Sequence, residues 1–170
     1  ANTLGEVLFY SSLNAAAARK GQPPRDSEVV SGAWSAALHL KGYALIDLER
    51  YEDAKSTLRH GIEVAPLNPA LWNELGAILQ LEKNWPEAAR AYEQAESGAK
   101  LFADPQGREV NALLTRALRG QGFVLIETGE LKKAEKLYRR CLKLDPDDDV
   151  AKKELAYIAG LKSQKKKRPR

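Results

Sequence analysis

The sequence contains no methionine, one cysteine and two histidines among its 170 residues. The single cysteine, Cys141, excludes an internal disulfide, a cysteine-based zinc site and a CxxC redox motif. No run approaches 18 apolar residues, so we expect no segment that spans a membrane. The hydrophobic content of 44% and charged content of 29% are ordinary for a globular domain, and the length suits one compact domain or one short solenoid.

Positive charge is concentrated at one end of the chain. The net charge is +4, but residues 162–170 contain six lysines or arginines and no acid. Without those six cations the chain has 21 basic and 23 acidic residues, a balance of −2. The excess of positive charge is therefore a basic tail and not a basic face.

The compartment is left open by the sequence. The chain starts at Ala1 and has no methionine, so we expect either that a leader was removed or that the chain was trimmed. Ala-Asn-Thr would suit a signal-peptidase product, which predicts an exported or periplasmic protein, and the alternative is a cytoplasmic one.

The most regular pattern lies in residues 69–102. Its first half has apolar and small residues at Trp72, Leu75, Gly76 and Leu79, and its second half has them at Ala88, Tyr92 and Ala95. Diluted copies flank it: the glycines at 42, 76 and 122 are 34 and 46 residues apart, and the alanines at 54, 88 and 134 keep the same spacing. Both halves have helical periodicity, so each copy predicts a pair of helices.

A period near 34 built from two helical halves resembles the tetratricopeptide repeat (TPR) family. The resemblance covers residues 35–148. It implies an all-α fold, a right-handed superhelical α-solenoid of antiparallel helix pairs, with three repeats at about 27–68, 69–102 and 107–148. A single helix pair cannot bury its apolar face alone, so the repeats stack and share one core.

Caps, prolines and apolar stripes predict the remaining elements of a single domain at 1–162. Residues 3–19 read as a helix, and Gly5, Phe9 and Ser12 imitate the second-helix pattern, which suggests an orphan second helix. A long helix should run from about 26 to 49 and carry the apolar residues Val30, Trp34, Leu38, Leu45 and Leu48. A capping helix at 149–161 and a disordered basic tail at 163–170 should complete the chain.

The spacing between the second and third repeats is twelve residues longer than the regular spacing of 34. No proline stops the second helix of the central repeat at the usual position, so we expect it to run to Leu101 or Phe102. The next helix should then start early, near Arg108. Residues 27–54 align with residues 107–134 at a spacing of 80, which predicts that the first and third repeats share lengthened first helices.

The resemblance also implies a functional surface. Family members hold a peptide or helix of another protein in a concave groove lined by the first helices. The matching positions here are His39, Tyr43, Asn73, Gln80, Arg116, Arg119 and Phe123, together with Ala36, Asp47, Ala77 and Glu127. Such a groove would hold an extended acidic or C-terminal segment. Alternatively, the two aromatics cover the edge of the core and the two arginines form a solvated face.

One subtype can be tested on residues. Members that clamp the C-terminal carboxylate of cytosolic heat-shock chaperones carry a lysine and an asparagine on the first repeat, an asparagine on the second and two cations on the third. This sequence offers His39 and Tyr43, then Glu74, then Arg116, with Gly120 in place of the last cation. We therefore do not expect a chaperone-tail clamp.

Residue patterns for catalysis, metals and cofactors are absent from the sequence. His39 and His60 have no carboxylate at metal-ligand spacing, and the acids at 145–149 lack the glycine and distal glutamate of a calcium loop. No glycine-rich phosphate loop occurs, and Cys141 occupies a small inward position that predicts a buried, inert thiol. We therefore expect no cofactor, no metal and no enzymatic activity.

The leading hypothesis is a non-catalytic interaction or scaffold module that binds a peptide or helix of a partner protein in its groove. The first alternative is self-association of an assembly element, in which the apolar residues Leu4, Val7, Leu8 and Phe9 accept a first helix from a second copy. A weaker alternative is an accessory to nucleic acid or an anionic surface through the tail residues Lys165, Lys166, Lys167 and Arg168, which would otherwise be simply solvated. The sequence does not identify the partner.

Overall fold

A computed structural model describes residues 32–101 and 108–167, with side chains at 33–101 and 111–164. These residues form seven helices and no strand, which confirms the all-α fold class. None of the described helices is both long and apolar enough to cross a membrane. The predicted helix at 3–19, with Leu4, Leu8 and Phe9, and the side chains of the tail cations at 165–168 lie outside the described residues.

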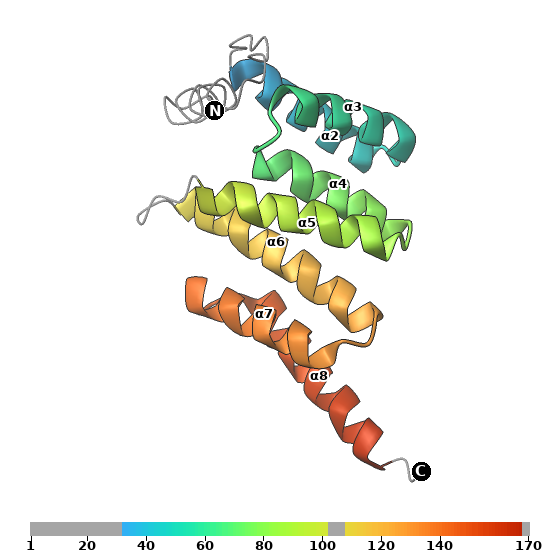
Figure 1. Ribbon diagram of the computed structural model, residues 1–170, viewed down its shortest axis with the longest axis vertical. Helices are drawn as coiled ribbons and strands as arrows, with labels where there is room; N and C mark the ends of the chain where they lie inside the picture. The colour runs from blue at the N-terminus through green and yellow to red at the C-terminus, as the bar shows by residue number, and fades with distance from the viewer. Residues whose placement is uncertain (1–31, 102–107, 168–170) are drawn as a thin grey trace, which may run out of the picture.

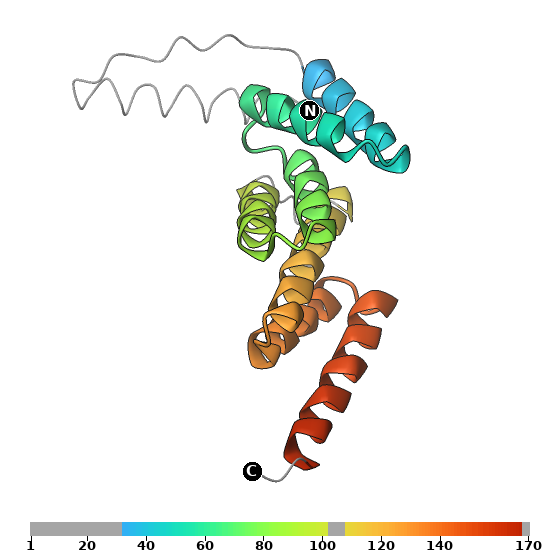
Figure 2. The ribbon, with the colours of Figure 1, turned by 90° about the vertical axis from the view of Figure 1, so that its right-hand side faces the viewer.

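The helices form three antiparallel pairs and a last single helix (Figure 1). Each pair contacts the next, and the first helices contact one another in the order α2, α4, α6, α8. In Figure 2 α5 lies on one side of α4, and α8 lies on the opposite side of the stack. The pairs are α2 (Gly32–Asp47) with α3 (Tyr51–Val64), α4 (Pro69–Leu81) with α5 (Trp85–Leu101), and α6 (Arg108–Glu127) with α7 (Leu131–Leu144), followed by α8 (Asp149–Lys167).

Equivalent polar side chains start α4 and α8. The Asn68 side chain accepts a hydrogen bond of 3.0 Å from the Ala70 amide, and Pro69 occupies the first helical position. Eighty residues later, Asp148 accepts one of 3.0 Å from the Ala151 amide. Both satisfy amides that a helix start leaves without partners, so α8 begins in the register of a further first helix.

The turn inside each pair bends through a residue with positive φ. Glu49 has φ 57°, Lys83 φ 58° and Gly129 φ 82°, and these residues hold the same position in successive repeats. Only glycine adopts this left-handed conformation without steric cost, so only the third repeat has the residue type that suits the turn.

The glycines at positions 42, 76 and 122 make room for a side chain of the second helix. A Cβ at these positions would lie 2.6 Å from Leu58, 2.8 Å from Tyr92 and 2.7 Å from Tyr138. The three buried side chains each lie sixteen residues after their glycine. In each of the three pairs, the sixteen-residue spacing therefore packs a large side chain of the second helix against a glycine of the first helix.

The two ends of the stack differ from its middle, and one expectation about them needs correction. Of the apolar residues predicted on the first long helix, Trp34 and Leu48 are exposed, whereas Leu38 and Leu45 are buried. The last helix does not end near 161 and the backbone is not disordered from 163, because α8 continues to Lys167. Lysine and glutamine favour helix, and lysines near a helix C-terminus interact well with its dipole, which extends α8 beyond its last apolar contact.

Candidate functional site: the first-helix face

The first helices form one continuous side of the stack, which we call the first-helix face. Repeat register places Tyr43, Ala77, Phe123 and Tyr157 at one equivalent position of α2, α4, α6 and α8, with spacings of 34, 46 and 34 residues. Because α2, α4, α6 and α8 contact one another in that order, these four residues form a row across the stack.

The row carries aromatic side chains that water reaches. Tyr43 is 49% exposed and Tyr157 is 54% exposed, while Phe123 is partly buried. The Phe123 ring lies 6.3 Å from the Trp85 ring, centroid to centroid, with 52° between the ring planes. This tilted contact anchors Phe123 at the edge of the core and leaves the two tyrosines as the accessible members of the row.

Arg116 lies on the same face, but its charge is already used within the protein. Its guanidinium donates to both carboxylate oxygens of Glu74, at 2.6 and 2.7 Å, and His39 Nε2 lies 3.4 Å from the same carboxylate. Burial would raise the pKa of Glu74, but hydrogen bonds with His39 and Arg116 outweigh it and lower the pKa. Glu74 therefore stays ionised and holds Arg116 in place.

Arg119 is engaged in the same way. Its Nη1 lies 3.3 Å from Oδ1 of Asp148, the carboxylate that caps α8, and the Asp148 side chain is buried. Neither predicted groove arginine is thus a free cation. The expectation that two arginines hold an acidic segment does not fit this geometry, because such a segment would have to displace Glu74 or Asp148.

The two predicted amides also point away from a partner. Asn73 is fully buried, and its Nδ2 donates a hydrogen bond of 3.1 Å to the Leu113 carbonyl of α6, so it fastens α4 to α6 and offers no surface. Gln80 is partly buried and accepts a hydrogen bond of 3.0 Å from the Tyr92 hydroxyl. Of the seven predicted groove residues, Tyr43 alone is exposed, and His39, Gln80, Arg116, Arg119 and Phe123 are partly buried.

Sequence reasoning missed Tyr157. The prediction of a terminal capping helix at 149–161 did not extend the repeat register into that helix. The signal was present in the 34-residue spacing from Phe123 to Tyr157 and in the 80-residue spacing from Asn68 to Asp148. Burial raises the pKa of Glu154, so this side of α8 is not uniformly solvated.

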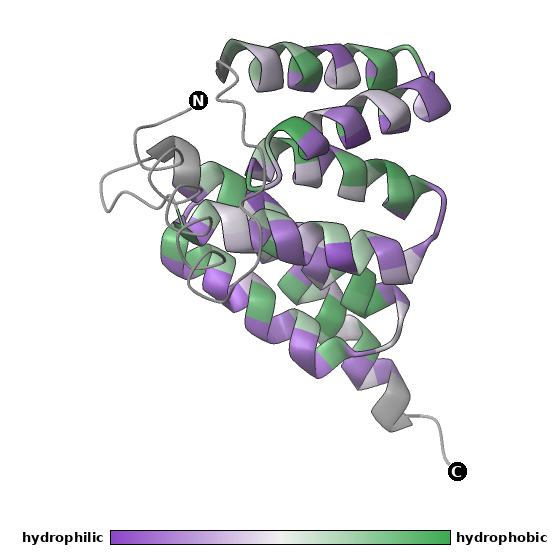
Figure 3. Cartoon of the chain, turned by 45° about the horizontal axis from the view of Figure 1, so that its top comes forward, coloured by the Kyte–Doolittle hydropathy of each residue, from purple (hydrophilic) through white to green (hydrophobic). Residues whose placement is uncertain are grey.

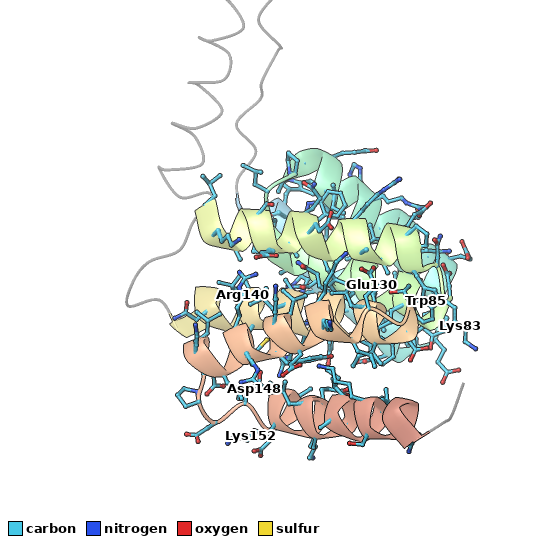
Figure 4. The ribbon with its side chains drawn as sticks, turned by 60° about the horizontal axis from the view of Figure 1, so that its bottom comes forward. Lys83, Trp85, Glu130, Arg140, Asp148 and Lys152 are labelled. Carbon is cyan, nitrogen blue, oxygen red and sulfur yellow. The ribbon has the colours of Figure 1, made fainter. Side chains whose placement is uncertain are left out.

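A second surface lies on the opposite side of the stack, in a groove of about 640 Å³ that we call the second-helix groove. Its walls are α5 and α7, which are bridged by side chains, and its floor is α6. Figure 4 places Trp85 and Glu130 near one end of the groove and Arg140 toward the other. Its apolar lining includes Trp85, Ala89, Val124, Leu125 and Leu137.

Charged side chains surround this groove and largely pair with one another. Arg140 donates to Glu96 across the groove at 2.7 Å, and Gln121 donates to the other Glu96 oxygen at 2.7 Å. Lys133 pairs with Glu130. Lys136 has no carboxylate partner among the described residues, so it is the cation that the groove offers to a ligand.

Chemistry-bearing side chains do not converge within the described ranges. His60 is exposed and lies 3.6 Å from Glu63, and residues 32–101 and 108–167 contain no cluster of three or more potential metal ligands. Cys141 is buried, as predicted, and its Sγ–H donates to the Thr115 carbonyl at 3.8 Å. Burial raises the pKa of this thiol to about 12, so it is not a nucleophile at neutral pH.

Two family models described as tetratricopeptide repeat match residues 39–107 and 115–148, which together make up more than half of the chain. The chain belongs to the tetratricopeptide repeat family. The longer match begins within the first repeat and covers the second, which follows at the regular spacing of 34 residues, and the shorter one lies within the third repeat. No curated protein matches the TPR chain by sequence.

Solved structures support the same fold. The first TPR domain of Spaghetti (RPAP3) bound to the HSP90 peptide SRMEEVD superposes with a TM-score of 0.68 at 21% identity, covering 81% of this chain and 99% of that one. The Sgt2 domain of Aspergillus fumigatus gives 0.66 at 18%, covering 80% and 85%. The Yersinia enterocolitica type III secretion chaperone SycD, in complex with a peptide of the translocator YopD, gives 0.60 at 17%, covering 78% and 92%. At these identities the likeness establishes the TPR fold alone.

Proposed function

We propose that this protein is a non-catalytic interaction module that binds a segment of another protein across its first-helix face. The observation that carries the proposal is the row of Tyr43, Ala77, Phe123 and Tyr157, whose outer members are half-exposed aromatics in repeat register. Aromatic side chains with a polar tip are favoured at protein interfaces, because they supply apolar contact area and a hydrogen-bonding group together.

The dimensions of the row suit a short extended segment. Packed helices lie roughly 8–10 Å apart, so the three steps from α2 to α8 span roughly 24–30 Å. An extended chain covers about 3.3 Å per residue, so a segment of about eight or nine residues would reach both tyrosines. The small side chain of Ala77 between the aromatics leaves room for a side chain of the partner.

The partner chemistry should differ from that of the chaperone peptides. The similar TPR domains include one bound to an HSP90 peptide and one in complex with the HSP70 peptide SGPTIEEVD, both of which end in acidic and apolar residues. Here Glu74 and Asp148 already neutralise Arg116 and Arg119. We therefore favour a segment with apolar or aromatic side chains over one recognised by a terminal carboxylate.

Peptide-display selection against the whole chain, followed by affinity measurements on variants, tests the proposal. Tyr43→Ala and Tyr157→Ala should each weaken the selected peptides by about tenfold or more, as expected for losing an interface aromatic. The matched control is Leu101→Ala, which removes a similarly exposed apolar side chain at the end of α5, and it should leave affinity unchanged.

The second-helix groove provides the alternative outcome. Peptides that bind there should be weakened by Lys136→Glu and Ala89→Trp, which reverse the groove's unpaired cation and fill its wall, and should be insensitive to Tyr43→Ala. That pattern would place binding on the wrong side of the stack for our proposal and would overturn it.

A further inference from the structure

The outer flank of α2, formed by Trp34, Ala37, Leu40 and Ala44, is an exposed apolar surface. Trp34 is 59% and Leu40 66% exposed, and both alanines are exposed. Figure 3 shows hydrophobic residues recurring along α2 at the end of the stack. A helix that is apolar on all sides normally has neighbours on all sides, but α2 contacts only α3 and α4 among the described helices.

The equivalent flank of α6 is buried. At the 80-residue spacing that aligns the two long first helices, the outer flank of α2 matches Leu114, Ala117, Gly120 and Val124, and all four are buried. Gly120 is packed against the Tyr92 ring of α5, so closely that a Cβ would lie 2.3 Å from it. The neighbour that covers this flank of α6 is therefore the second helix of the preceding pair.

The equivalent flank of α4, at the 34-residue spacing, is also buried. Leu71 and Ile78 of α4 correspond to Ala37 and Ala44, and both are fully buried. Leu71 lies against Gly61 of α3, again the second helix of the preceding pair. Two independent copies of the repeat thus cover this flank with the same kind of element, and only α2 lacks one among the described residues.

The chain holds a candidate for that element in residues 3–19, which the sequence predicts to be a helix with a second-helix pattern. Twelve residues, 20–31, connect it to α2, whereas α5 and α6 are joined by only the six residues 102–107. Twelve residues reach up to about 40 Å when extended, and the 16-residue α2 is about 24 Å long. The connection is long enough for residues 3–19 to return along α2.

We propose that residues 3–19 of the same chain pack as a helix on the outer flank of α2, where α3 and α5 cover α4 and α6. The apolar residues Leu4, Leu8 and Phe9 of that helix would cover Leu40 and Trp34, and the solenoid would gain a half repeat at this end. The flank is then an internal surface of the full chain and is not open to a partner.

Hydrogen exchange of the full chain, read on peptides within residues 3–19, tests the proposal. Amides of this segment should be protected, and Leu40→Glu should speed their exchange by about tenfold or more by placing a charge in the apolar contact. The control Leu81→Glu makes the same change at a similarly exposed leucine, which belongs to α4 and not to the outer flank of α2, and it should leave the segment protected. Unprotected amides in the wild-type chain, or protection that survives Leu40→Glu, would overturn the proposal.

A second variant distinguishes release of the segment from unfolding of the stack, and a second measurement distinguishes a helix of the same chain from one of a second copy. Phe9 lies outside the described stack, so Phe9→Glu should release the segment while the amides of α3 to α7 keep their protection. This result does not depend on whether Leu40→Glu disturbs the fold. Protection should also be independent of concentration, with a solution mass of 18.8 kDa over a tenfold dilution. Protection that grows with concentration together with a doubled mass would overturn the proposal in favour of a second copy supplying the helix.

Discussion

The Arg116 guanidinium of α6 donates two hydrogen bonds, of 2.6 and 2.7 Å, to the Glu74 carboxylate of α4. Glu74 is almost fully buried, whereas Arg116 remains more than a third exposed. The pair therefore works mainly as a fastening between neighbouring repeats, because a buried carboxylate cannot be left without its cation.

Replacing Arg116 by alanine should lower the free energy of unfolding by about 1–3 kcal/mol, since it leaves Glu74 buried with only His39 near it. Urea unfolding measures the change. In the Glu74→Gln background the same replacement should cost much less, because no buried charge remains to be compensated. An equal cost in both backgrounds would show that Arg116 stabilises through its aliphatic packing alone.

Gly98 offers a test of how closely the repeats approach. A Cβ at position 98 would lie 2.2 Å from the Leu67 carbonyl oxygen, and backbone cannot move aside as a flexible side chain can. Gly98→Ala should therefore destabilise the fold by about 1–3 kcal/mol. Gly160→Ala is the matched control, because nothing lies within 4 Å of its Cβ position and the helix should gain about 0.5–1 kcal/mol. Thermal unfolding of both variants should shift the midpoint in opposite directions.

The lowered pKa of Glu96 should make the folded protein less stable in acid. Burial would raise its pKa, but hydrogen bonds from Lys100, Gln121 and Arg140 outweigh burial and lower the pKa to about 2. A group whose pKa is lower in the folded state stabilises the fold above its ordinary value of 4.5, and that stability disappears as the pH falls from there toward 2. Comparing the wild type with Glu96→Gln by denaturant unfolding between pH 5 and 3 isolates this contribution from other carboxylates. Identical slopes against pH would rule it out.

Cys141 should be protected from thiol reagents while the protein is folded. Raising its pKa from 9.0 to about 12 lowers the thiolate fraction about a thousandfold at neutral pH, and the side chain is fully buried. Reaction with a chromogenic disulfide reagent should therefore be slow in buffer and fast in denaturant. An engineered Ser97→Cys on the exposed side of α5 should react rapidly under both conditions and serves as the reference.

Periodicity was enough to predict the architecture and most helix boundaries. The glycine and alanine spacings located the pairs, and the twelve-residue irregularity anticipated that α5 would extend to Leu101 and that α6 would start at Arg108. These features depend on contacts within a pair or between adjacent turns of helix, and such contacts repeat with the sequence.

The environments of individual polar residues could not be predicted in this way. Asn73 reaches a carbonyl 40 residues away, and Arg116 meets a carboxylate 42 residues away. Which side chains meet over such separations depends on how far one helix is rotated and shifted against the next, and the repeat pattern does not specify that rotation. The aromatic Tyr157 differs, because its position followed from the register and needed only the extension of the repeat into α8.

The course of α8 changes what the cluster of positive charge at its end can do. A flexible tether would let its cations search a volume around the protein and would lose conformational entropy on binding. A 19-residue helix instead acts as a rod about 28 Å long. Lys162 on this rod pairs with Glu135 of α7, so its direction is fixed by the stack. The backbone that carries the positive charges at the end of α8 is therefore held in one orientation relative to the stack and to Tyr157.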